Sequence, residues 1–380
     1  MCAAAVRTIS TASVVGARPQ FVKLAPVSRA MQQARLPISD QIIHTGQHYD
    51  DSMSRVFFEQ LEIPQPAVNL GIGSGPHGRQ TAHMLEAIEG YLLEARPDAV
   101  MVYGDTNSTL AGALAAAKLH IPVAHVEAGL RSSNRCMPEE LNRIVTDHLS
   151  QLLFAPTTTA IANLTAEGLK DRAMLTGDVM YDAVLFSAQR AFAHSRILDD
   201  LGLTAGQYGV ATIHRAENTA RDELQTLLQA LNAAAQSYGS IVFAVHPRTA
   251  AVLRTELTGW QPAADLVVAG PLAYGDMLTL LQGANFVLTD SGGLQKEAYF
   301  LGCPCVTLRD ETEWSETLQQ DANQIAGRDG RHLPEILRGL AQRPRRRFEP
   351  LPAARPGPFG DGHAAQRIVE ALCVFCESRS

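Results

Sequence analysis

Short apolar runs alternate along this chain with longer stretches in which apolar residues recur at helical spacing. The runs typical of buried strands are "RTISTASVV", "QIIH", "DAVMVYG" and "PVAHVEAG" in the first half, and "YGVATIH", "SIVFAVHP", "DLVVAG", "ANFVLTD" and "PCVTLRD" in the second. Between them lie stretches such as "TLAGALAAAKLH" and "RDELQTLLQALNAAAQSYG", which predict helices. The alternation predicts an α/β protein whose parallel sheets are covered by helices on both faces.

The strands form two series, which predict two doubly wound, Rossmann-like domains with a break between Gly177 and Gly206. Ligands of open α/β sheets bind at the carboxyl ends of the strands, and polar residues gather there in both series. These residues are Arg18, His44, Asp105 and Glu127 in the first series, and His214, His246, Arg248, Asp290, Arg309 and Glu313 in the second. If the two domains face each other through these edges, one cleft collects all of these side chains.

Three carboxylates are candidates for acid–base chemistry. Asp105 and Glu127 end consecutive strand units of one sheet, and Glu139 lies just inside a helix that begins at Pro138. Carboxylates that converge at one edge can divide acid and base roles between them. Each also has a structural alternative, because Asp105 can cap the following helix and Glu139 can favour the helix dipole and pair with Arg143.

The stretch "TDSGGLQKEA" places Gly292 and Gly293 between an apolar run and a helical segment. A helix that starts on glycines exposes its first N–H groups, and these groups together with the helix dipole suit a diphosphate. The alternative is a tight strand-to-helix turn in which Ser291 caps the helix.

His214 in "TIHRAEN" and His246 in "AVHPRT" close strands beside arginines, a setting that suits contact with phosphate or hydroxyl groups. Arg18 and Lys23 in "GARPQFVK" are placed to meet the same anion. The stretch "GSGPHG", residues 73–78, matches a dinucleotide-binding pattern but follows a proline-broken segment, so it predicts a loop and no nicotinamide cofactor. No spacing of histidines and acids predicts a metal site.

Composition narrows the choice of partners. The chain has 380 residues, enough for two domains, and a formal net charge of −7, which argues against a nucleic-acid surface. No apolar stretch approaches the ~20 residues that span a membrane. Six cysteines in this length do not indicate a disulfide framework. We therefore expect a cytoplasmic protein with no nucleic-acid or membrane partner.

Taken together, the motifs resemble those of the non-hydrolysing UDP-N-acetylglucosamine 2-epimerases. The resemblance runs nearly end to end, through "GARPQFVK", "HTGQHYD", "YGDTNSTLAGALAA", "HVEAGLR", "MPEELNR", "TGDVMYDA", "TIHRAEN", "HPRT", "DSGGLQKEA", "LRDETEW" and "PFGDGHAAQRIVEAL". It implies a GT-B-type architecture, a homodimer and no cofactor, with the last helix crossing back to the first domain. The expected domains are residues 1–178 joined by the terminal helix 362–380, and a UDP-binding domain, residues 179–361.

Carried over motif by motif, the resemblance makes Asp105, Glu127 and Glu139 the acid–base carboxylates and His214 a catalytic-site residue. It implies that UDP is held by Arg18, Lys23, Arg143, Ser291, Gly292, Gly293 and Glu297. Three strand-end residues complete the predicted substrate-binding set: His246, Arg248 and Arg309.

The implied reaction converts UDP-N-acetylglucosamine into UDP-N-acetylmannosamine for surface polysaccharide synthesis. UDP leaves C1 while C2 loses its proton, and UDP then returns to the 2-acetamidoglucal intermediate to give the C2 epimer. Two departures from the usual family motifs, "GARPQF" where GTRPE is common and the short "RSSNRCMPEE", resemble the branch that acts on UDP-2,3-diacetamido-2,3-dideoxy-glucuronate. Both substrates stay open at this point.

Three alternatives rank below an epimerase. A UDP-sugar glycosyltransferase of the same architecture would need an acceptor groove and would not need three carboxylates around C1 and C2. A hydrolysing epimerase would release free N-acetylmannosamine and UDP. A non-catalytic UDP-sugar sensor would not need the carboxylates at all.

Overall fold

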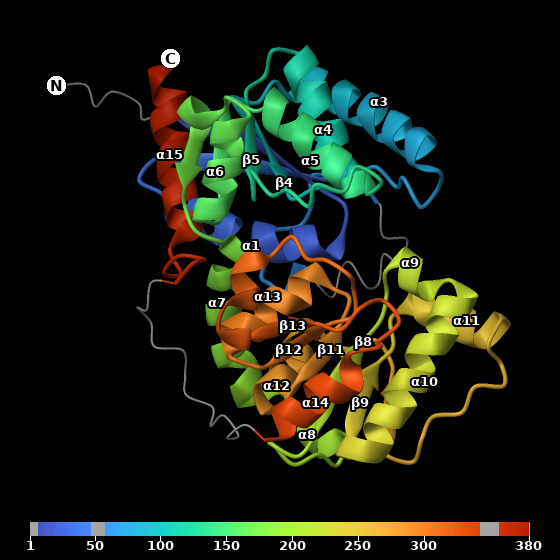
Figure 1. Ribbon diagram of the computed structural model, residues 1–380. Coiled ribbons are helices and arrows are strands. Elements are labelled where there is room, and N and C mark those ends of the chain that lie inside the picture. The colour runs from blue at the N-terminus through green and yellow to red at the C-terminus, as the bar shows by residue number, and fades with distance from the viewer. Residues whose placement is uncertain (1–6, 47–57, 343–356, 380) are drawn as a thin grey trace. The chain divides into compact units, whose positions relative to one another are not determined.

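The computed structural model describes residues 7–46, 58–342 and 357–379 (Figure 1). The chain divides into two compact units, unit 1 with residues 1–183 and 353–380, and unit 2 with residues 184–352. The observed boundaries between the units therefore fall at 183/184 and 352/353. The boundaries expected from the sequence, 178/179 and 361/362, lie five and nine residues from them.

Unit 1 is built on a seven-stranded parallel sheet in the order β3-β2-β1-β4-β5-β6-β7. Its strands are β1 (Ile9–Val15), β2 (Ile38–His44), β3 (Val68–Asn69), β4 (Ala99–Tyr103), β5 (Val123–Val126), β6 (Leu152–Ala155) and β7 (Ala173–Leu175). Its helices are α1 (Arg18–Gln32), α3 (His77–Ala95), α4 (Asn107–Lys118), α5 (Pro138–Leu149), α6 (Thr158–Ala166), the short 3-10 turn η1 (Lys170–Arg172) and α15 (Ala364–Ser378). Helix α7 (Val179–His194) runs across the boundary between the units.

Unit 2 repeats the plan with a six-stranded parallel sheet in the order β10-β9-β8-β11-β12-β13. Its strands are β8 (Gly209–Thr212), β9 (Ile241–Ala244), β10 (Leu266–Ala269), β11 (Val287–Thr289), β12 (Cys305–Thr307) and β13 (Asn323–Ile325). Its helices are α8 (Ile197–Asp200), α9 (Ala216–Thr219), α10 (Arg221–Tyr238), α11 (Pro247–Thr255), α12 (Tyr274–Gly283), α13 (Gly292–Leu301), α14 (Leu333–Ala341) and the 3-10 turn η2 (Ser315–Asp321).

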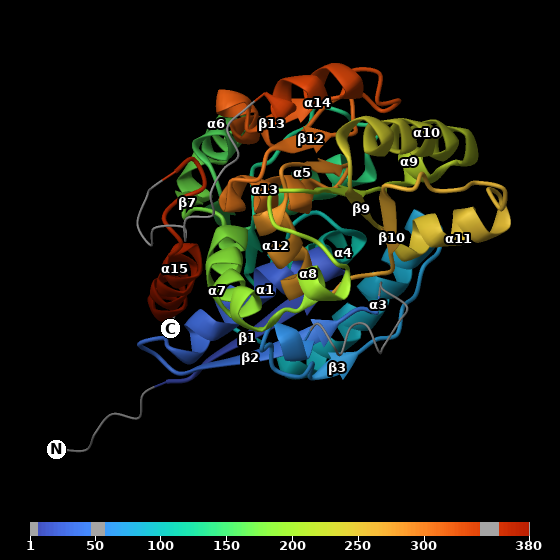
Figure 2. The same ribbon diagram turned by 90° about the horizontal axis from the view of Figure 1, so that it is seen from below.

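Successive side chains along each strand point to opposite faces of the sheet, so apolar side chains pack against the helices on both faces. In unit 2, Val210 packs on the α8, α12 and α13 side, while its neighbour Ala211 packs on the α10 and α14 side. Figure 2 shows the strands of this sheet between α10 and α14 on one side and α8 and α12 on the other. In unit 1, α3, α4 and α5 lie side by side (Figure 1), and α1 packs against α15.

The predicted doubly wound α/β class is confirmed, and all nine expected strands are present. The strands that the sequence analysis missed are β3, β6, β7 and β13. Three of them form sheet edges and contain only two or three residues, too few for a hydrophobic period to develop. In both sheets the strand order reverses beside the first strand, so the topological switch points lie between β1 and β4 and between β8 and β11.

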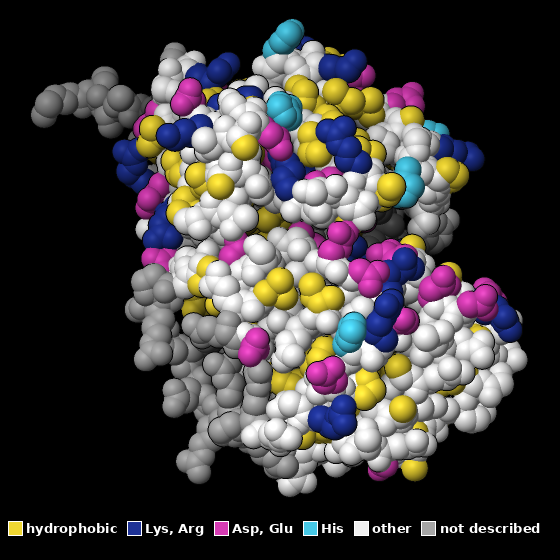
Figure 3. Space-filling model, in the orientation of Figure 1, with side chains coloured by type: hydrophobic (Ala, Val, Ile, Leu, Met, Phe, Trp, Pro, Cys, Tyr) yellow, Lys and Arg dark blue, Asp and Glu magenta, His cyan; other side chains and the backbone are white. Residues whose placement is uncertain are grey.

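Within the described residues, no helix combines the length and the apolar character that a membrane crossing requires. Figure 3 shows apolar side chains grouped over the α3–α5 side of unit 1, where Leu141 and Val145 of α5 are 49% and 42% exposed. These two residues are one turn apart, so α5 carries an apolar stripe on its outer face. The buried residues of the helix are polar: Glu140, Asn142, Arg143, Thr146 and Asp147.

Asp182 ties the amino end of α15 to unit 1. Its carboxylate accepts the backbone N–H groups of Ala364 at 3.2 Å and Ala365 at 2.8 Å. Nearby, the N–H of Asp178 donates to the carbonyl of Phe359 at 2.9 Å. Burial raises the pKa of Asp182 to about 6, although the two N–H donors act in the opposite direction.

We predict that Asp182 makes folding stability depend on pH. Because its folded pKa of about 6 lies above its unfolded value, stability should fall as the pH rises from about 4 to about 6, by about 3 kcal/mol. Asp182→Asn keeps an acceptor oxygen without a charge and should remove this slope. Asp182→Ala loses the cap and should be less stable than Asp182→Asn by about 1 kcal/mol. Urea unfolding from pH 4 to 8 tests both statements, and an unchanged slope in Asp182→Asn would contradict them.

Candidate active site

Asp105 lies in the turn between β4 and α4, at the switch point of unit 1. The preceding residue, Gly104, has a φ of +63°, a left-handed conformation that glycine adopts without strain. The Asp105 carboxylate pairs with Nη2 of Arg143 at 2.5 Å, and the Asp105 carbonyl accepts from Asn142 at 2.9 Å. The alternative role of Asp105 as the helix cap is wrong, because the side chain of Thr106 caps α4 by accepting from the N–H of Thr109.

Glu127 follows β5 and forms a buried ion pair with Lys23 of α1. The Lys23 Nζ and Glu127 Oε1 atoms are 2.9 Å apart, and both residues are at least 93% buried. Glu127 has a φ of +74°, which is uncommon for a residue with a side chain and indicates strain retained at this position. A Cβ at Gly104 would lie 3.1 Å from Lys23 Nζ and 3.6 Å from Glu127 Oε1. The structure therefore brings the Gly104–Asp105 turn, Lys23 and Glu127 together, as the strand order required.

Helix α5 carries Glu139 and Arg143. It begins at Pro138 as predicted, and Glu139 lies half-buried in its first turn. Arg143 is buried and pairs with Glu140 at 3.1 Å as well as with Asp105. Glu140 was missed by the sequence analysis, although it lies three residues before Arg143. Its carboxylate also accepts from the backbone N–H groups of Ser132 and Ser133, so it holds the preceding loop.

The start of α1 is organised by Gln20, a second residue that the sequence analysis did not assign. Its Oε1 accepts the N–H groups of Gly16 at 2.8 Å and Ala17 at 3.0 Å, and its Nε2 donates to the Tyr103 carbonyl at 3.0 Å. Arg18 is the first residue of α1 and is half-buried. An amide can accept and donate at once, whereas an ionised glutamate can only accept. A glutamate would have to be protonated to donate to Tyr103, whereas Gln20 donates as a neutral amide. Gln20 of the "GARPQF" motif therefore links the ends of β1 and β4.

Asp290 is the buried centre of the second switch point, between β8 and β11. Its carboxylate accepts the N–H groups of His214 and Arg215, the Asn218 side chain and the His214 ring Nδ1, the last at 2.8 Å. Burial alone would raise the pKa of Asp290, but the His214 hydrogen bond, the His214 charge and the two backbone N–H groups outweigh it and hold the pKa at about 2. With Nδ1 directed at Asp290, the His214 ring is fixed in orientation while its side chain remains 33% exposed.

His246 and Arg248 lie beside His214, as their strand-end positions predicted. The His246 ring caps α11 by accepting the N–H of Arg248, and its centroid is 5.3 Å from that of His214. Arg248 donates from Nη1 to the His214 carbonyl at 3.0 Å and is itself exposed. The carboxyl ends of β8 and β9 thus hold two imidazoles and one guanidinium.

Helix α13 begins at Gly292, and Ser291 caps it by accepting the N–H of Leu294, as the sequence suggested. A Cβ at Gly292 would lie 2.6 Å from Oε1 of Glu313, so any larger residue here would displace the Glu313 carboxylate. Glu313 is held by Arg309 at 2.8 Å and lies 3.5 Å from Arg215. The start of α13 therefore combines a helix N-terminus with two arginines and one acid. Further along the helix, Gly293 is half-buried and Glu297 is buried.

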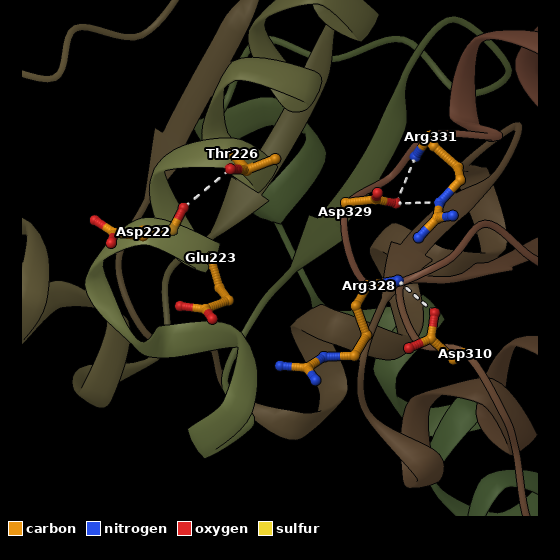
Figure 4. Close-up of a pocket in the computed structure, with 7 residues that line it drawn as sticks. All are labelled: Asp222, Glu223, Thr226, Asp310, Arg328, Asp329 and Arg331. Atoms are coloured by element: carbon orange, nitrogen blue, oxygen red, sulfur yellow. Dashed lines mark hydrogen bonds and ion pairs between the residues drawn. The ribbon is translucent and has the colours of Figure 1, made fainter.

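A cavity of about 380 Å³ in unit 2 contains none of the predicted site residues (Figure 4). It is lined by Asp222, Glu223, Thr226, Asp310, Arg328, Asp329 and Arg331. Four acids against two arginines give it a net negative lining, which disfavours a diphosphate. In the described part of the chain, no group of three or more histidines, cysteines and acids is arranged to hold a metal ion.

Comparison with known proteins gives matches over almost the whole chain. The family model described as UDP-N-acetylglucosamine 2-epimerase matches residues 30–373. A UDP-N-acetylglucosamine 2-epimerase homolog of Methanococcus maripaludis is 47% identical, covering 95% of this chain and 98% of its own. The UDP-2,3-diacetamido-2,3-dideoxy-D-glucuronate 2-epimerase of Pseudomonas aeruginosa is 46% identical with the same coverage.

A solved structure shares both the fold and the sequence. The crystal structure of the Methanocaldococcus jannaschii UDP-GlcNAc 2-epimerase, in complex with UDP-GlcNAc and UDP, matches with a TM-score of 0.87 and 39% identity. The match covers 97% of this chain and 100% of the other. The chain therefore belongs to the UDP-N-acetylglucosamine 2-epimerase family, enzymes of the isomerase type with a two-domain, GT-B-like α/β fold.

Proposed function

We propose that this enzyme inverts C2 of a UDP-2-acetamido sugar by eliminating UDP and adding it back. The observation that carries the proposal is the carboxylate set at the unit 1 switch point, with Glu127 held by Lys23 and Asp105 held by Arg143. Carboxylates fixed in this way can exchange a proton with a substrate carbon without reorganising. Glu139, one turn before Arg143, is the third member of the proposed acid–base set.

The chemistry explains why elimination is the favoured route. The C2 proton of the sugar is not acidic, because no carbonyl adjoins that ring carbon. If UDP departs from C1 while a carboxylate removes the C2 proton, no free carbanion forms and the product is a 2-acetamidoglucal. Protonation of C2 on the opposite face and return of UDP to C1 then give the epimer. A proton acceptor and a proton donor on opposite faces are required, which two or more carboxylates supply.

The diphosphate requires a site that stabilises a leaving anion and retains it. We propose that the start of α13 meets the diphosphate through Ser291, Gly292 and Gly293, and that Glu297 accepts from the ribose hydroxyls. The imidazoles of His214 and His246 and the guanidiniums of Arg248 and Arg309 would add donors beside it. Arg18 is proposed to contribute from α1. Fixed donors near a departing anion stabilise the charge that develops in the transition state.

We propose UDP-N-acetylglucosamine as substrate, with UDP-N-acetylmannosamine as product and surface polysaccharide synthesis as the destination. UDP-2,3-diacetamido-2,3-dideoxy-glucuronate is the second candidate. It is favoured by the motifs "GARPQF" and "RSSNRCMPEE", which resemble that branch, and by the Pseudomonas aeruginosa relative that carries its name at 46% identity. A glycosyltransferase is the remoter candidate, and it alone would require an acceptor.

Proton NMR in D₂O, without an acceptor, tests the reaction and names the substrate. One sample contains UDP-N-acetylglucosamine and the other UDP-2,3-diacetamido-2,3-dideoxy-glucuronate. We expect deuterium to enter C2 and a new manno anomeric signal to appear in one of them. Stoichiometric free UDP would indicate a hydrolysing epimerase instead. Binding of UDP without exchange in either sample would contradict the proposal and favour a transferase or a sensor.

The carboxylates are tested by Asp105→Asn, Glu127→Gln and Glu139→Gln. Each should lower turnover by ~100-fold or more while nucleotide binding is largely kept, because proton transfer is lost and the diphosphate site lies elsewhere. Glu86→Gln, which changes an exposed acid on α3, is the matched control and should turn over normally. Normal turnover in all three site variants would remove the basis of the assignment.

Gly292→Val tests the proposed diphosphate site. The added side chain should displace Glu313 and cover the first N–H groups of α13, so UDP affinity should fall by about 10-fold or more. Gly339→Val is the control, because a Cβ at this position in α14 meets no other atom within 4 Å. Isothermal titration with UDP measures both variants. Equal affinity in Gly292→Val and the wild type would place the diphosphate elsewhere.

A further inference from the structure

His125 is a fully buried histidine that the proposed mechanism does not use. It lies in β5, two residues before Glu127, and none of its surface is exposed. Its ring Nδ1 is 2.7 Å from Oδ1 of Asp147, and its Nε2 is 2.7 Å from the carbonyl oxygen of Gly104. Both ring nitrogens thus make short contacts with oxygen atoms, one from α5 and one from the end of β4.

The neighbours of His125 can only accept hydrogen bonds. A backbone carbonyl has no proton to give. Asp147 is ionised, since its other oxygen already accepts from the Gly129 N–H at 3.1 Å and from Arg131 Nη1 at 2.8 Å. Burial would raise the pKa of Asp147, but the hydrogen bond and charge of His125, with those of Arg131, outweigh it and lower the pKa. Two acceptors require two N–H groups, which only the protonated ring possesses.

We infer that His125 is held as an imidazolium cation and serves as a positioning residue for Asp105 and Glu127, by fixing the carbonyl of Gly104. The inference rests on the proposed function of these two carboxylates. His125 touches no reacting atom and acts through the backbone turn that carries Asp105.

The geometry of Gly104 explains why this bond matters. Gly104 is bound to β5 from both sides, because its N–H donates to the Val126 carbonyl at 3.0 Å while its carbonyl accepts from His125. With a φ of +63°, the glycine has no side chain that could anchor the turn. The two hydrogen bonds therefore set where β4 ends and where the Asp105 side chain begins. They also hold the Gly104 Cα beside Glu127 and Lys23, which a Cβ there would nearly touch.

A buried cation needs compensating charge, and a continuous series of partners supplies it. Asp147 pairs with His125 and Arg131, and Arg131 makes a bidentate contact with Glu167, with both distances 2.7 Å. Glu167 in turn lies 3.3 Å from His148, which is half exposed. Charges alternate along the series, so the imidazolium is neutralised on the side away from Gly104. On the Gly104 side, the nearby charged groups are paired with one another, Lys23 with Glu127 and Asp105 with Arg143.

Two substitutions separate the two contacts of the ring. His125→Gln places a side-chain amide near the Nε2 position, where it can donate to Gly104 but not reach Asp147. His125→Asn places its amide near the Nδ1 position, where it can donate to Asp147 but not reach Gly104. His148→Gln, at the exposed end of the same series, is the matched control.

Steady-state kinetics on the substrate that the wild type epimerises provide the first readout. We expect His125→Asn to lower kcat by about 100-fold and His125→Gln by about 10-fold, with KM changed by less than about threefold in both, because a misplaced turn affects the chemical step rather than the diphosphate site. His148→Gln should behave as the wild type. Equal losses in the two His125 variants, or no loss in His125→Asn, would overturn the positioning role.

Nitrogen-15 NMR of histidine-labelled enzyme provides the second readout and does not depend on turnover. The ring signals that disappear in His125→Gln belong to His125, and both nitrogens should carry protons in the folded enzyme. If that variant does not fold, Asp147→Asn identifies the same ring, because it should convert one doubly protonated histidine into a singly protonated one. An unprotonated nitrogen in the wild type would overturn the inference. A doubly protonated His125 in an enzyme inert towards both UDP-sugars would instead reject the proposed function and leave the imidazolium assignment standing.

Discussion

Burying a carboxylate at the end of a strand is unfavourable unless cations or N–H groups meet it, and this requirement organises both switch points. In unit 2, the fully buried Asp290 is met by two backbone N–H groups, an amide and the His214 ring. In unit 1, Glu127 is met by Lys23. The partners lie far from the acid in the sequence, in residues 214–218 for Asp290 and in α1 for Glu127, so satisfying one acid also places a loop or a helix. The predicted ligand-binding side chains are held in position by the same contacts.

Parallel sheets create the places where this can happen. In each unit the strand order reverses beside the first strand, so the loops after β1 and β4 are neighbours in unit 1 and those after β8 and β11 are neighbours in unit 2. Glycine serves two different purposes in these loops. Gly104 supplies a left-handed backbone, whereas Gly292 leaves the space that the Glu313 carboxylate occupies. The first requirement concerns conformation and the second concerns a contact between distant segments.

Both units pair a histidine with a buried aspartate, but the two rings are used differently. His214 directs Nδ1 at Asp290 and keeps a third of its side chain exposed, which suits a group that meets a ligand. His125 is enclosed and directs both nitrogens at acceptors, which suits a fixed structural cation. Exposure and the identity of the second partner distinguish the two cases, although in the sequence His125 lies within an apolar run and His214 directly follows one.

Local and periodic features could be predicted from the sequence because they depend on neighbouring residues. This group includes the buried strands, the start of α5 at Pro138 and the Ser291 cap of α13. The polar residues at strand ends and the family membership were also evident, because motif order and spacing are properties of the chain itself. The short edge strands were not evident, since pairing partners rather than composition define them.

Partner choice was decided by the tertiary structure alone. Nothing in the local sequence indicates that Arg143 pairs with Asp105, 38 residues earlier, or that Gln20 reaches the carbonyl of Tyr103. The same holds for the enclosure of His125 between Asp147 and Gly104. Residue types and their periodicity determined which elements form and which ends carry polar groups. The pairing of charged and polar side chains depends on how the helices pack over the sheet, because ion pairs and hydrogen bonds form only at short distances, which the packing determines.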